Sequence, residues 1–261
     1  MTKVIALDAG HGLNTAGKQT PTGIKEWTLN DKVRDKIVNK LKDYDCTFVF
    51  PDNDEGNTDE TLAARWNKYM DGNLKVDAMV SIHHNAYTGK WNNATGVEVF
   101  TDKNYTEDDM KLAQAIYKNF PAYTGLKGRG IKKENWAVIN QNRIPAVLVE
   151  GGFMDGNKDY KVIISDAGQE GYAQAVAEGL IEFLKLEKKI KQVNYKLKFK
   201  QGMNIRKGPG VEHALNTKEK VKKGYIYTIV GEATSTKNTK WGKLKSGAGW
   251  VCIEAKYCEK A

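Results

Sequence analysis

Residues Val4-Ile-Ala-Leu-Asp-Ala-Gly-His-Gly12 are the stretch that decides how this chain folds. Apolar or small residues run into Asp8, and glycines then stand on both sides of His11. This pattern predicts a buried strand that ends in a sharp turn, with the imidazole at the rim of a sheet. Ligands of open α/β sheets sit beyond the carboxyl ends of the strands, so His11 is a candidate metal ligand. A polar turn with a chance histidine is the alternative, and this stretch alone does not separate the two.

Two further apolar runs end in polar residues in the same way. The first run, residues 78–82, stops at His83-His84-Asn85, and the second, residues 145–149, stops at Glu150. Because the carboxyl ends of parallel strands meet at one edge of a sheet, we expect these side chains to lie near His11.

Glu26, early in the first expected helix, adds a second carboxylate to this set. Two histidines and a carboxylate are the ligands of many catalytic zinc sites, which keep one position open for water. A further glutamate suits a general base that acts on that water. A carboxylate in the first turn of a helix also complements the helix dipole, which is the simpler explanation for Glu26.

Four motifs in this order resemble the zinc N-acetylmuramoyl-L-alanine amidases of bacterial and phage wall lysis. They are Asp8–Gly12, Glu26 with Asn30, Ser81–Ala86 and Val149–Phe153, and the resemblance covers about residues 1–185. It implies one zinc ion on His11, Glu26 and His83, with Glu150 as the catalytic carboxylate. It also implies that the substrate is bacterial peptidoglycan.

The Ser-x-His-x-Asn pattern of that family selects His83 as the ligand, whereas His84 stands where the family usually has a small residue. We therefore expect His84 to line the cleft, and the reversed assignment is the alternative. Asn85 and Arg129 are further candidates for substrate binding, because Arg129 resembles a family position near the substrate. A solvated loop arginine is the alternative for Arg129.

Strands alternate with helices along residues 1–186. Helices are expected over residues 24–43, from 57 or 58 to about 70, from 106 to 120 and over 169–186. Further strands are expected at 47–50, 97–100 and 136–139, and a loop over the site at 123–133. Thr106 and Asp109 resemble a capping box. The order predicts an α/β domain with a twisted, mostly parallel sheet that has helices on both faces.

The pattern changes after a charged linker, residues 187–194. Residues 195–261 hold short alternating runs separated by glycine-rich turns, which predict a small all-β barrel. Met203–Gly210, Trp241–Leu244 and Gly249-Trp250 resemble a bacterial SH3-type cell-wall-binding domain. The two tryptophans can equally fill the barrel core, whereas Tyr225 and Tyr227 are candidates to line a groove for a wall polymer or peptide.

Charge is divided unevenly between the two segments. Residues 1–185 carry 23 Lys and Arg against 26 Asp and Glu, whereas residues 186–261 carry 18 against 6. A basic segment favours an anionic polymer or nucleic acid, although a lysine-rich solvated surface is the simpler explanation. No nucleic-acid partner is expected, because the cleft lies in the acidic half and the basic half has no nucleic-acid motif.

The remaining features exclude several classes of protein. No apolar run is long enough to cross a bilayer, so no membrane insertion is expected. The first strand begins without a signal peptide, which predicts a protein that is made in the cytoplasm and acts on the cell wall after release. The three cysteines are odd in number and lack CxxC spacing; they are Cys46, Cys252 and Cys258. This argues against a disulfide framework and against a thiolate zinc site.

These features together predict a peptidoglycan hydrolase that cleaves the amide bond between N-acetylmuramic acid and L-alanine. The chain resembles a phage endolysin of a Gram-positive host, with clostridia as a candidate host. Two alternatives stay open. One is a zinc endopeptidase acting within the stem peptide, and the other is a wall-binding protein without catalytic activity.

Overall fold

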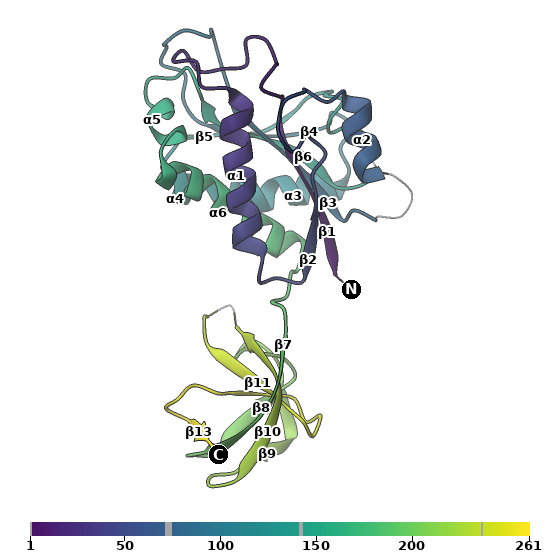
Figure 1. The fold of residues 1–261 in the computed structure, drawn as a ribbon, viewed down its shortest axis with the longest axis vertical. Coiled ribbons are helices and arrows are strands. Elements are labelled where there is room, and N and C mark those ends of the chain that lie inside the picture. The colour runs from purple at the N-terminus through teal and green to yellow at the C-terminus, as the bar shows by residue number, and fades with distance from the viewer. Residues whose placement is uncertain (1, 71–74, 141–142, 236) are drawn as a thin grey trace. The chain divides into compact units, whose positions relative to one another are not determined.

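The computed structural model describes residues 2–70, 75–140, 143–235 and 237–261 (Figure 1). The chain divides into two compact units, Met1–Glu187 and Lys188–Ala261, which we call unit 1 and unit 2. Unit 1 is a mixed α/β structure and unit 2 consists of antiparallel strands.

Unit 1 is built on a six-stranded sheet with the order β2-β1-β3-β6-β4-β5. The strands are β1 (Lys3–Ala9), β2 (Cys46–Val49), β3 (Ala78–Asn85), β4 (Val97–Thr101), β5 (Gly128–Lys133) and β6 (Ala146–Phe153). Neighbouring strands run parallel except β4 and β6, which are antiparallel. The mostly parallel sheet expected from the sequence is therefore confirmed.

Helices cover both faces of this sheet (Figure 1). They are α1 (Glu26–Leu41), α2 (Leu62–Met70), α3 (Glu107–Tyr117), α4 (Phe120–Thr124), α5 (Asp159–Ile163) and α6 (Asp166–Leu184). Helices α1, α3 and α6 contribute to the larger apolar cluster on one face, which we call the α6 face. Helix α2 contributes Trp66 to a smaller cluster on the opposite face, the α2 face.

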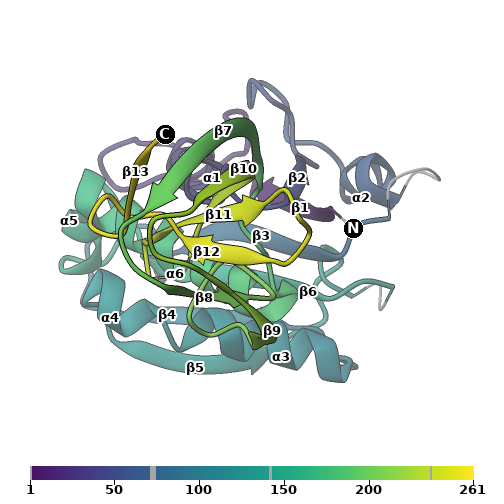
Figure 2. The same ribbon diagram turned by 90° about the horizontal axis from the view of Figure 1, so that it is seen from below.

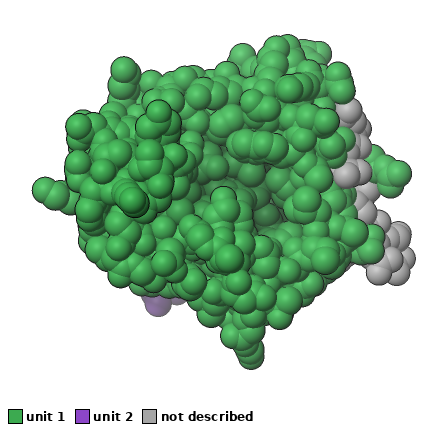
Figure 3. Space-filling view, turned by 90° about the horizontal axis from the view of Figure 1, so that it is seen from above, with its two compact units in different colours: residues 1–187 green, residues 188–261 purple. Residues whose placement is uncertain are grey.

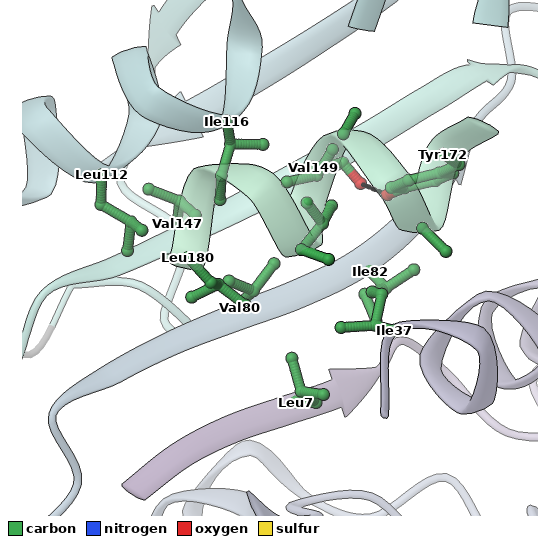
Figure 4. Packing of buried hydrophobic residues seen from close by; sticks show 14 of the residues in the cluster. Leu7, Ile37, Val80, Ile82, Leu112, Ile116, Val147, Val149, Tyr172 and Leu180 are labelled. Carbon is green, nitrogen blue, oxygen red and sulfur yellow. Dashed lines mark hydrogen bonds between the residues drawn. The ribbon is translucent and has the colours of Figure 1, made fainter. Parts of the chain in front are cut away.

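Alternation along the strands assigns each residue to one of these faces. In β1, Ile5 and Leu7 belong to the cluster of the α6 face, whereas Ala6 between them belongs to that of the α2 face. Figure 4 shows Leu7 and Ile82 on the same side of the sheet as Ile37 of α1. Each such aliphatic side chain contributes about 1.5–3 kcal/mol when fully buried, so the clusters fix which face every strand residue takes.

Tyr172 of α6 joins two central strands at the level where their apolar residues end. Its hydroxyl donates to the carbonyl oxygen of Val149 at 2.8 Å, the bond drawn in Figure 4, and lies 3.3 Å from that of His83. A β-carbon on Gly151 would lie 2.0 Å from the Tyr172 ring, so position 151 admits only glycine in this packing. The ring thus fixes the ends of β3 and β6 relative to α6.

Two expectations for the secondary structure of unit 1 are wrong. Residues 136–139 form a turn and not a strand, because the indole of Trp66 donates to the carbonyl of Ala137 at 3.0 Å and Trp136 packs on Phe100. The expected loop 123–133 contains strand β5, which pairs with β4 at the edge of the sheet. Glycines are not typical of strands, so the sequence did not indicate one here. The apolar residue of this strand, Ile131, nevertheless packs against the core.

Helix ends differ from expectation by a few residues. Helix α1 begins at Glu26 itself, and α2 begins at Leu62, where Thr61 accepts a hydrogen bond from the Ala64 amide at 3.1 Å. The capping box at Thr106 and Asp109 is confirmed, since each side chain bonds the backbone amide of the other. Among the described residues, none of the helices combines the length and apolar character needed to cross a bilayer.

Unit 2 contains a seven-stranded sheet with the order β13-β7-β10-β11-β12-β8-β9, and all paired neighbours are antiparallel (Figure 2). The strands are β7 (Lys191–Phe199), β8 (Met203–Arg206), β9 (Leu215–Val221), β10 (Ile226–Thr234), β11 (Lys240–Leu244), β12 (Trp250–Cys252) and β13 (Cys258–Lys260). Strands β9 and β13 were not expected, and β7 begins inside the predicted linker.

The aromatic residues of unit 2 divide between its core and its surface. Trp241 and Trp250 are 3% and 5% exposed, so they fill the core. Tyr227 packs on Phe199 at 5.7 Å between ring centroids, whereas Tyr225 is 60% exposed. Of the two tyrosines expected to line a groove, Tyr225 is therefore exposed, whereas Tyr227 is half-buried against the core.

Candidate metal centre and active site

Three predicted ligands converge at the carboxyl ends of the central strands. His11 follows β1, Glu26 begins α1 and His83 lies in β3. One ligand atom from each lies within 4.8 Å of the others. His11 Nε2 is 3.4 Å from Glu26 Oε2, and His83 Nδ1 is 3.2 Å from Glu26 Oε1. The group could therefore hold one metal ion.

Arg65 of α2 holds the turn that carries His11. His11 adopts a left-handed backbone conformation with φ of 68°, which a residue other than glycine rarely takes. The Arg65 guanidinium donates to the carbonyls of Ala9 at 3.0 Å and His11 at 2.6 Å, and it forms an ion pair with Asp8. Arg65 was not expected from the sequence, because these partners are more than 50 residues away in the chain.

A chain of hydrogen bonds orients the ring of His83. Ser81 donates to Asp8 Oδ2 at 2.6 Å, so its oxygen is left to accept a hydrogen bond from His83 Nε2 at 3.1 Å. Nδ1 on the other side of the ring lies 3.2 Å from Glu26 Oε1 and, when protonated, donates to it. If Nδ1 loses this proton while Nε2 keeps its own, the Nδ1 lone pair is directed toward Glu26, where a metal ion would bind. Ser81 and Asp8 are cross-strand partners, so the sheet itself sets this arrangement.

Gly10 makes room for the same ring. A β-carbon at this position would lie 2.0 Å from Cε1 of His83 and 2.2 Å from Nε2. The Gly10 carbonyl accepts a hydrogen bond from the Asn30 side chain at 3.1 Å, which ties this turn to α1. The close approach of backbone and imidazole thus requires glycine here.

The prediction that His84 lines the cleft is wrong. His84 is 2% exposed, its Nδ1 lies 2.8 Å from Asn30 Oδ1, and its ring contacts Tyr172 edge-on. Successive strand residues point to opposite faces of the sheet. Because His83 points to the α2 face, His84 points to the α6 face. His84 nevertheless supports the site, since its backbone amide donates to Glu26 Oε1 at 3.2 Å.

Glu150 lies directly across from His83, as its register partner on the neighbouring strand β6. Its Oε2 atom is buried and has no hydrogen-bond partner among the described residues. Burial raises the pKa of Glu150 to about 8, and the negative charge of Glu26 adds to this shift. A carboxyl group in this state can carry a proton at neutral pH and exchange it with a bound substrate.

Glu98 continues the same row on the other side of Glu150, because β4 pairs with β6 at this level. It is 2% exposed and forms ion pairs with Arg129 and Lys132, and Asn85 donates to it at 3.2 Å. The predicted substrate residues Arg129 and Asn85 thus lie beside the site and bind Glu98. A carboxylate between two buried valines of β4 was the signal that could have identified Glu98.

The charges of the three-ligand group suit a cation. Burial raises the pKa of Glu26, but its hydrogen bond with His83 and the nearby imidazoles outweigh burial and the pKa falls. Burial lowers the pKa of His11 to about 4, so this ring is neutral at neutral pH. An ionised carboxylate beside a neutral imidazole offers lone pairs to a metal ion.

A cavity of about 560 Å³ opens beside His11 and His83. Its other walls include Leu62, Arg65 and Trp136, which come from the region of α2 and the turn at 136–139. Figure 3 views unit 1 from the side on which the parallel strands end and shows a hollow in this surface. The cavity therefore leaves His11 and His83 accessible from the α2 face.

Comparison with known proteins shows that unit 1 is similar to cell-wall amidases. Residues 5–182 match the N-acetylmuramoyl-L-alanine amidase family. The chain is 31% identical over 185 residues to the probable cell wall amidase LytH of Staphylococcus epidermidis, covering 69% of this chain and 58% of that protein. It is 32% identical over 193 residues to the endolysin of Bacillus phage SPP1, covering 72% of this chain and 69% of the phage protein. The chain thus spans little more than half of the staphylococcal relative.

Solved structures of two amidases resemble the fold. The N-acetylmuramoyl-L-alanine amidase from Clostridium difficile 630 superposes with a TM-score of 0.64 at 28% identity, over 70% of this chain and 97% of that one. The catalytic domain of CwlV from Bacillus (Paenibacillus) polymyxa gives 0.63 at 29% identity, over 71% and 99%. The matched residues 5–182 include His11, Glu26, His83 and Glu150, and the chain belongs to the N-acetylmuramoyl-L-alanine amidase family.

Proposed function

We propose that this protein hydrolyses the amide bond between the lactyl group of N-acetylmuramic acid and L-alanine of the stem peptide, using zinc. The observation that carries the proposal is the Glu150 carboxyl group, whose Oε2 atom is buried without a hydrogen-bond partner among the described residues, directly across from a His-Glu-His group that could hold a metal ion. Family membership supports this bond as the target.

The donor set suits zinc. Two imidazole nitrogens and one carboxylate are the ligands of catalytic zinc sites that keep an open position. His11, Glu26 and His83 would hold the ion, and Arg65 and Ser81 keep the two imidazoles oriented. Zinc, when bound, supplies a Lewis acid that polarises the scissile carbonyl and lowers the pKa of a water molecule.

Glu150 carries the proton in the proposed reaction. As an ionised carboxylate it takes a proton from the attacking water, and it then donates that proton to the departing amine of L-alanine. Burial, which favours the neutral form of Glu150, helps it to accept the proton in the first step. The strand pairing of β3 and β6 keeps it beside the metal ligands throughout.

We further propose that unit 2 is a wall-binding module of the bacterial SH3 type, with a wall polymer or a wall peptide as its ligand. The antiparallel sheet and the excess of lysine in this part of the chain support this role. The similarity to a phage endolysin supports an endolysin that acts on the wall of a Gram-positive host. Neither proposal involves nucleic acid.

Product analysis of digested peptidoglycan tests the enzymatic proposal. We expect stem peptides with new L-alanine amino termini and glycan strands without new reducing ends. New reducing sugars would instead identify a glycosidase, and amino termini other than alanine would identify an endopeptidase. Binding to walls without any product would leave a wall-binding protein without activity.

A further inference from the structure

A loop rich in exposed aromatic surface follows the metal-binding strand. Residues 86–92, which we call the aromatic loop, begin directly after β3. Tyr87 is 74% exposed and Trp91 is 46% exposed. Large aromatic rings bury most of their surface in the core of a protein, so two such rings on one short loop indicate a binding surface.

The backbone of this loop is held by one buried carboxylate. Asp155, which is 0% exposed, accepts hydrogen bonds from the amides of Tyr87 at 2.9 Å, Thr88 at 2.8 Å and Gly89 at 2.8 Å. These bonds lower the pKa of Asp155, although burial raises it. The carboxylate stays ionised at neutral pH and fixes the first half of the loop.

The second half of the loop is fixed as well. The Asn92 amide donates to the carbonyl of Asp155 at 3.1 Å, and the carbonyl of Asn92 accepts from the Asn157 amide at 2.8 Å. The indole of Trp91 meets the ring of Tyr160 edge-on, with centroids 4.9 Å apart. The backbone of the aromatic loop is therefore fixed in both halves and the Trp91 ring is held against Tyr160, which reduces the entropy lost on binding a ligand.

The loop lies close to the reacting groups. Tyr87 is four residues beyond His83, so the two Cα atoms lie at most roughly 14 Å apart. Asp155, which anchors the loop, is five residues beyond Glu150 on the neighbouring strand. A polymer that places one bond at the metal ligands has neighbouring residues within reach of Tyr87 and Trp91.

We propose that the aromatic loop binds the glycan strand, on the sugars adjoining the muramic acid whose amide is cleaved. This inference rests on the proposed function. Exposed aromatic faces pack on the apolar C–H faces of sugar rings, while charged stem peptides need ions or free amides. The amides of Tyr87, Thr88 and Gly89 are already used by Asp155, so apart from the exposed Lys90 ammonium the loop offers a ligand mainly aromatic surface.

Two soluble substrates test this proposal in the full-length protein. One is a stem peptide on a single N-acetylmuramic acid, and the other is the same peptide on a strand of several sugars. Trp91→Ala and Tyr87→Ala should each raise KM for the longer substrate by about tenfold, equivalent to about 1.4 kcal/mol, with kcat unchanged. The KM for the single-sugar substrate should stay the same.

Tyr123→Ala is the matched control, because Tyr123 is also exposed, at 40%, and lies in α4 outside the loop. It should change neither KM. An equal rise of KM on both substrates in the Trp91 variant would overturn the glycan assignment and place the peptide on the loop. Unchanged KM on both substrates would remove the loop from substrate binding altogether.

A binding measurement separates this proposal from the proposed function. Peptide-free strands of alternating N-acetylglucosamine and N-acetylmuramic acid serve as the probe. The indole N–H resonance of Trp91, assigned by its loss in Trp91→Ala, should shift when these strands are added to the full-length protein. A shift without hydrolysis of either substrate would contradict the amidase but support the loop. No shift would overturn the loop proposal even in an active enzyme.

Discussion

His83 and Glu150 stand directly opposite each other on the hydrogen-bonded strands β3 and β6. Both side chains project from the α2 face, so the imidazole proposed to bind the metal and the carboxyl proposed to carry the proton are held side by side by a backbone ladder. Sites built on strands are positioned more accurately than sites on loops. The remaining ligands come from a turn and a helix end, which are fixed by Arg65 and Asn30.

Glu150→Gln should remove activity while the protein folds normally and retains zinc. The amide has the size of the carboxyl group but cannot carry the proton, and general acid–base groups contribute about 10²–10⁴-fold to the rate. Hydrolysis of peptidoglycan and metal content should be measured on the same preparation. A glutamine variant with full activity would refute the mechanism, and one that lost its zinc would make Glu150 a ligand.

His83→Ala should abolish both zinc binding and activity, whereas His84→Ala should keep most of the zinc. His84 lies in the α6 face, and its loss leaves the buried Oδ1 atom of Asn30 without its partner, at a cost of about 1–3 kcal/mol in the free energy of unfolding. Metal stoichiometry and urea denaturation of both variants check this difference. Loss of zinc from the His84 variant alone would show that the assignment of the two histidines is reversed.

Gly10→Ala should weaken zinc binding by about 10–100-fold, the range found when groups supporting a metal ligand are changed. The new β-carbon would overlap the ring of His83, which must then move. Gly202→Ala is the control, because the nearest atom to a β-carbon there is 3.4 Å away. Zinc titration of both variants measures their zinc affinities. Equal affinities would show that the turn at Gly10 can shift away from the His83 ring without weakening zinc binding.

Zinc uptake at neutral pH should release protons, and zinc affinity should increase as the pH rises toward 8. In the metal-free protein burial raises the pKa of Glu150 to about 8, so its carboxyl is protonated at neutral pH. A nearby cation favours the carboxylate and expels this proton. Calorimetric titrations in buffers of different ionisation enthalpy count the protons released.

Glu150→Gln is the comparison for this measurement. It should release fewer protons on zinc binding, and the rest should come from His83, whose pKa is raised by Glu26 although burial lowers it. The same proton release from both proteins would show that Glu150 is already ionised before zinc binds.

Limited trypsin digestion should cut first in residues 187–190, between the two units. This segment holds Lys188 and Lys189 and precedes the first strand of unit 2, so its backbone can enter a protease. Two folded fragments should result, and the larger should still hydrolyse purified wall material. Unfolding of both fragments after a single cut would refute the prediction that the two units fold independently.

The sequence predicted much of unit 1 because its central strands are continuous apolar runs, which leave a strong pattern. Such a run does not tell which face of the sheet holds the cleft, and it did not place His83 and His84 on opposite faces. The family pattern selected His83, whereas the burial of His84 follows from Tyr172, a residue of a distant helix. The expected cleft position of His84 was wrong for this reason.

Contacts between distant segments account for the other differences. Arg65 and Glu98 act through partners from several elements, which local pattern does not reveal. Residues 136–139 have the composition of a strand, yet the hydrogen bond from Trp66 holds them in a turn. Tertiary contacts override local preference in such short segments.

The order of the strands also determines when the site can form. Strand β6 is the last strand of the unit 1 sheet to be synthesised, yet it lies between β3 and β4. The nascent sheet must therefore remain open at its centre until residues 146–153 have left the ribosome. Such long-range pairing slows folding, and His83 gains Glu150 as its register partner only when this middle strand inserts.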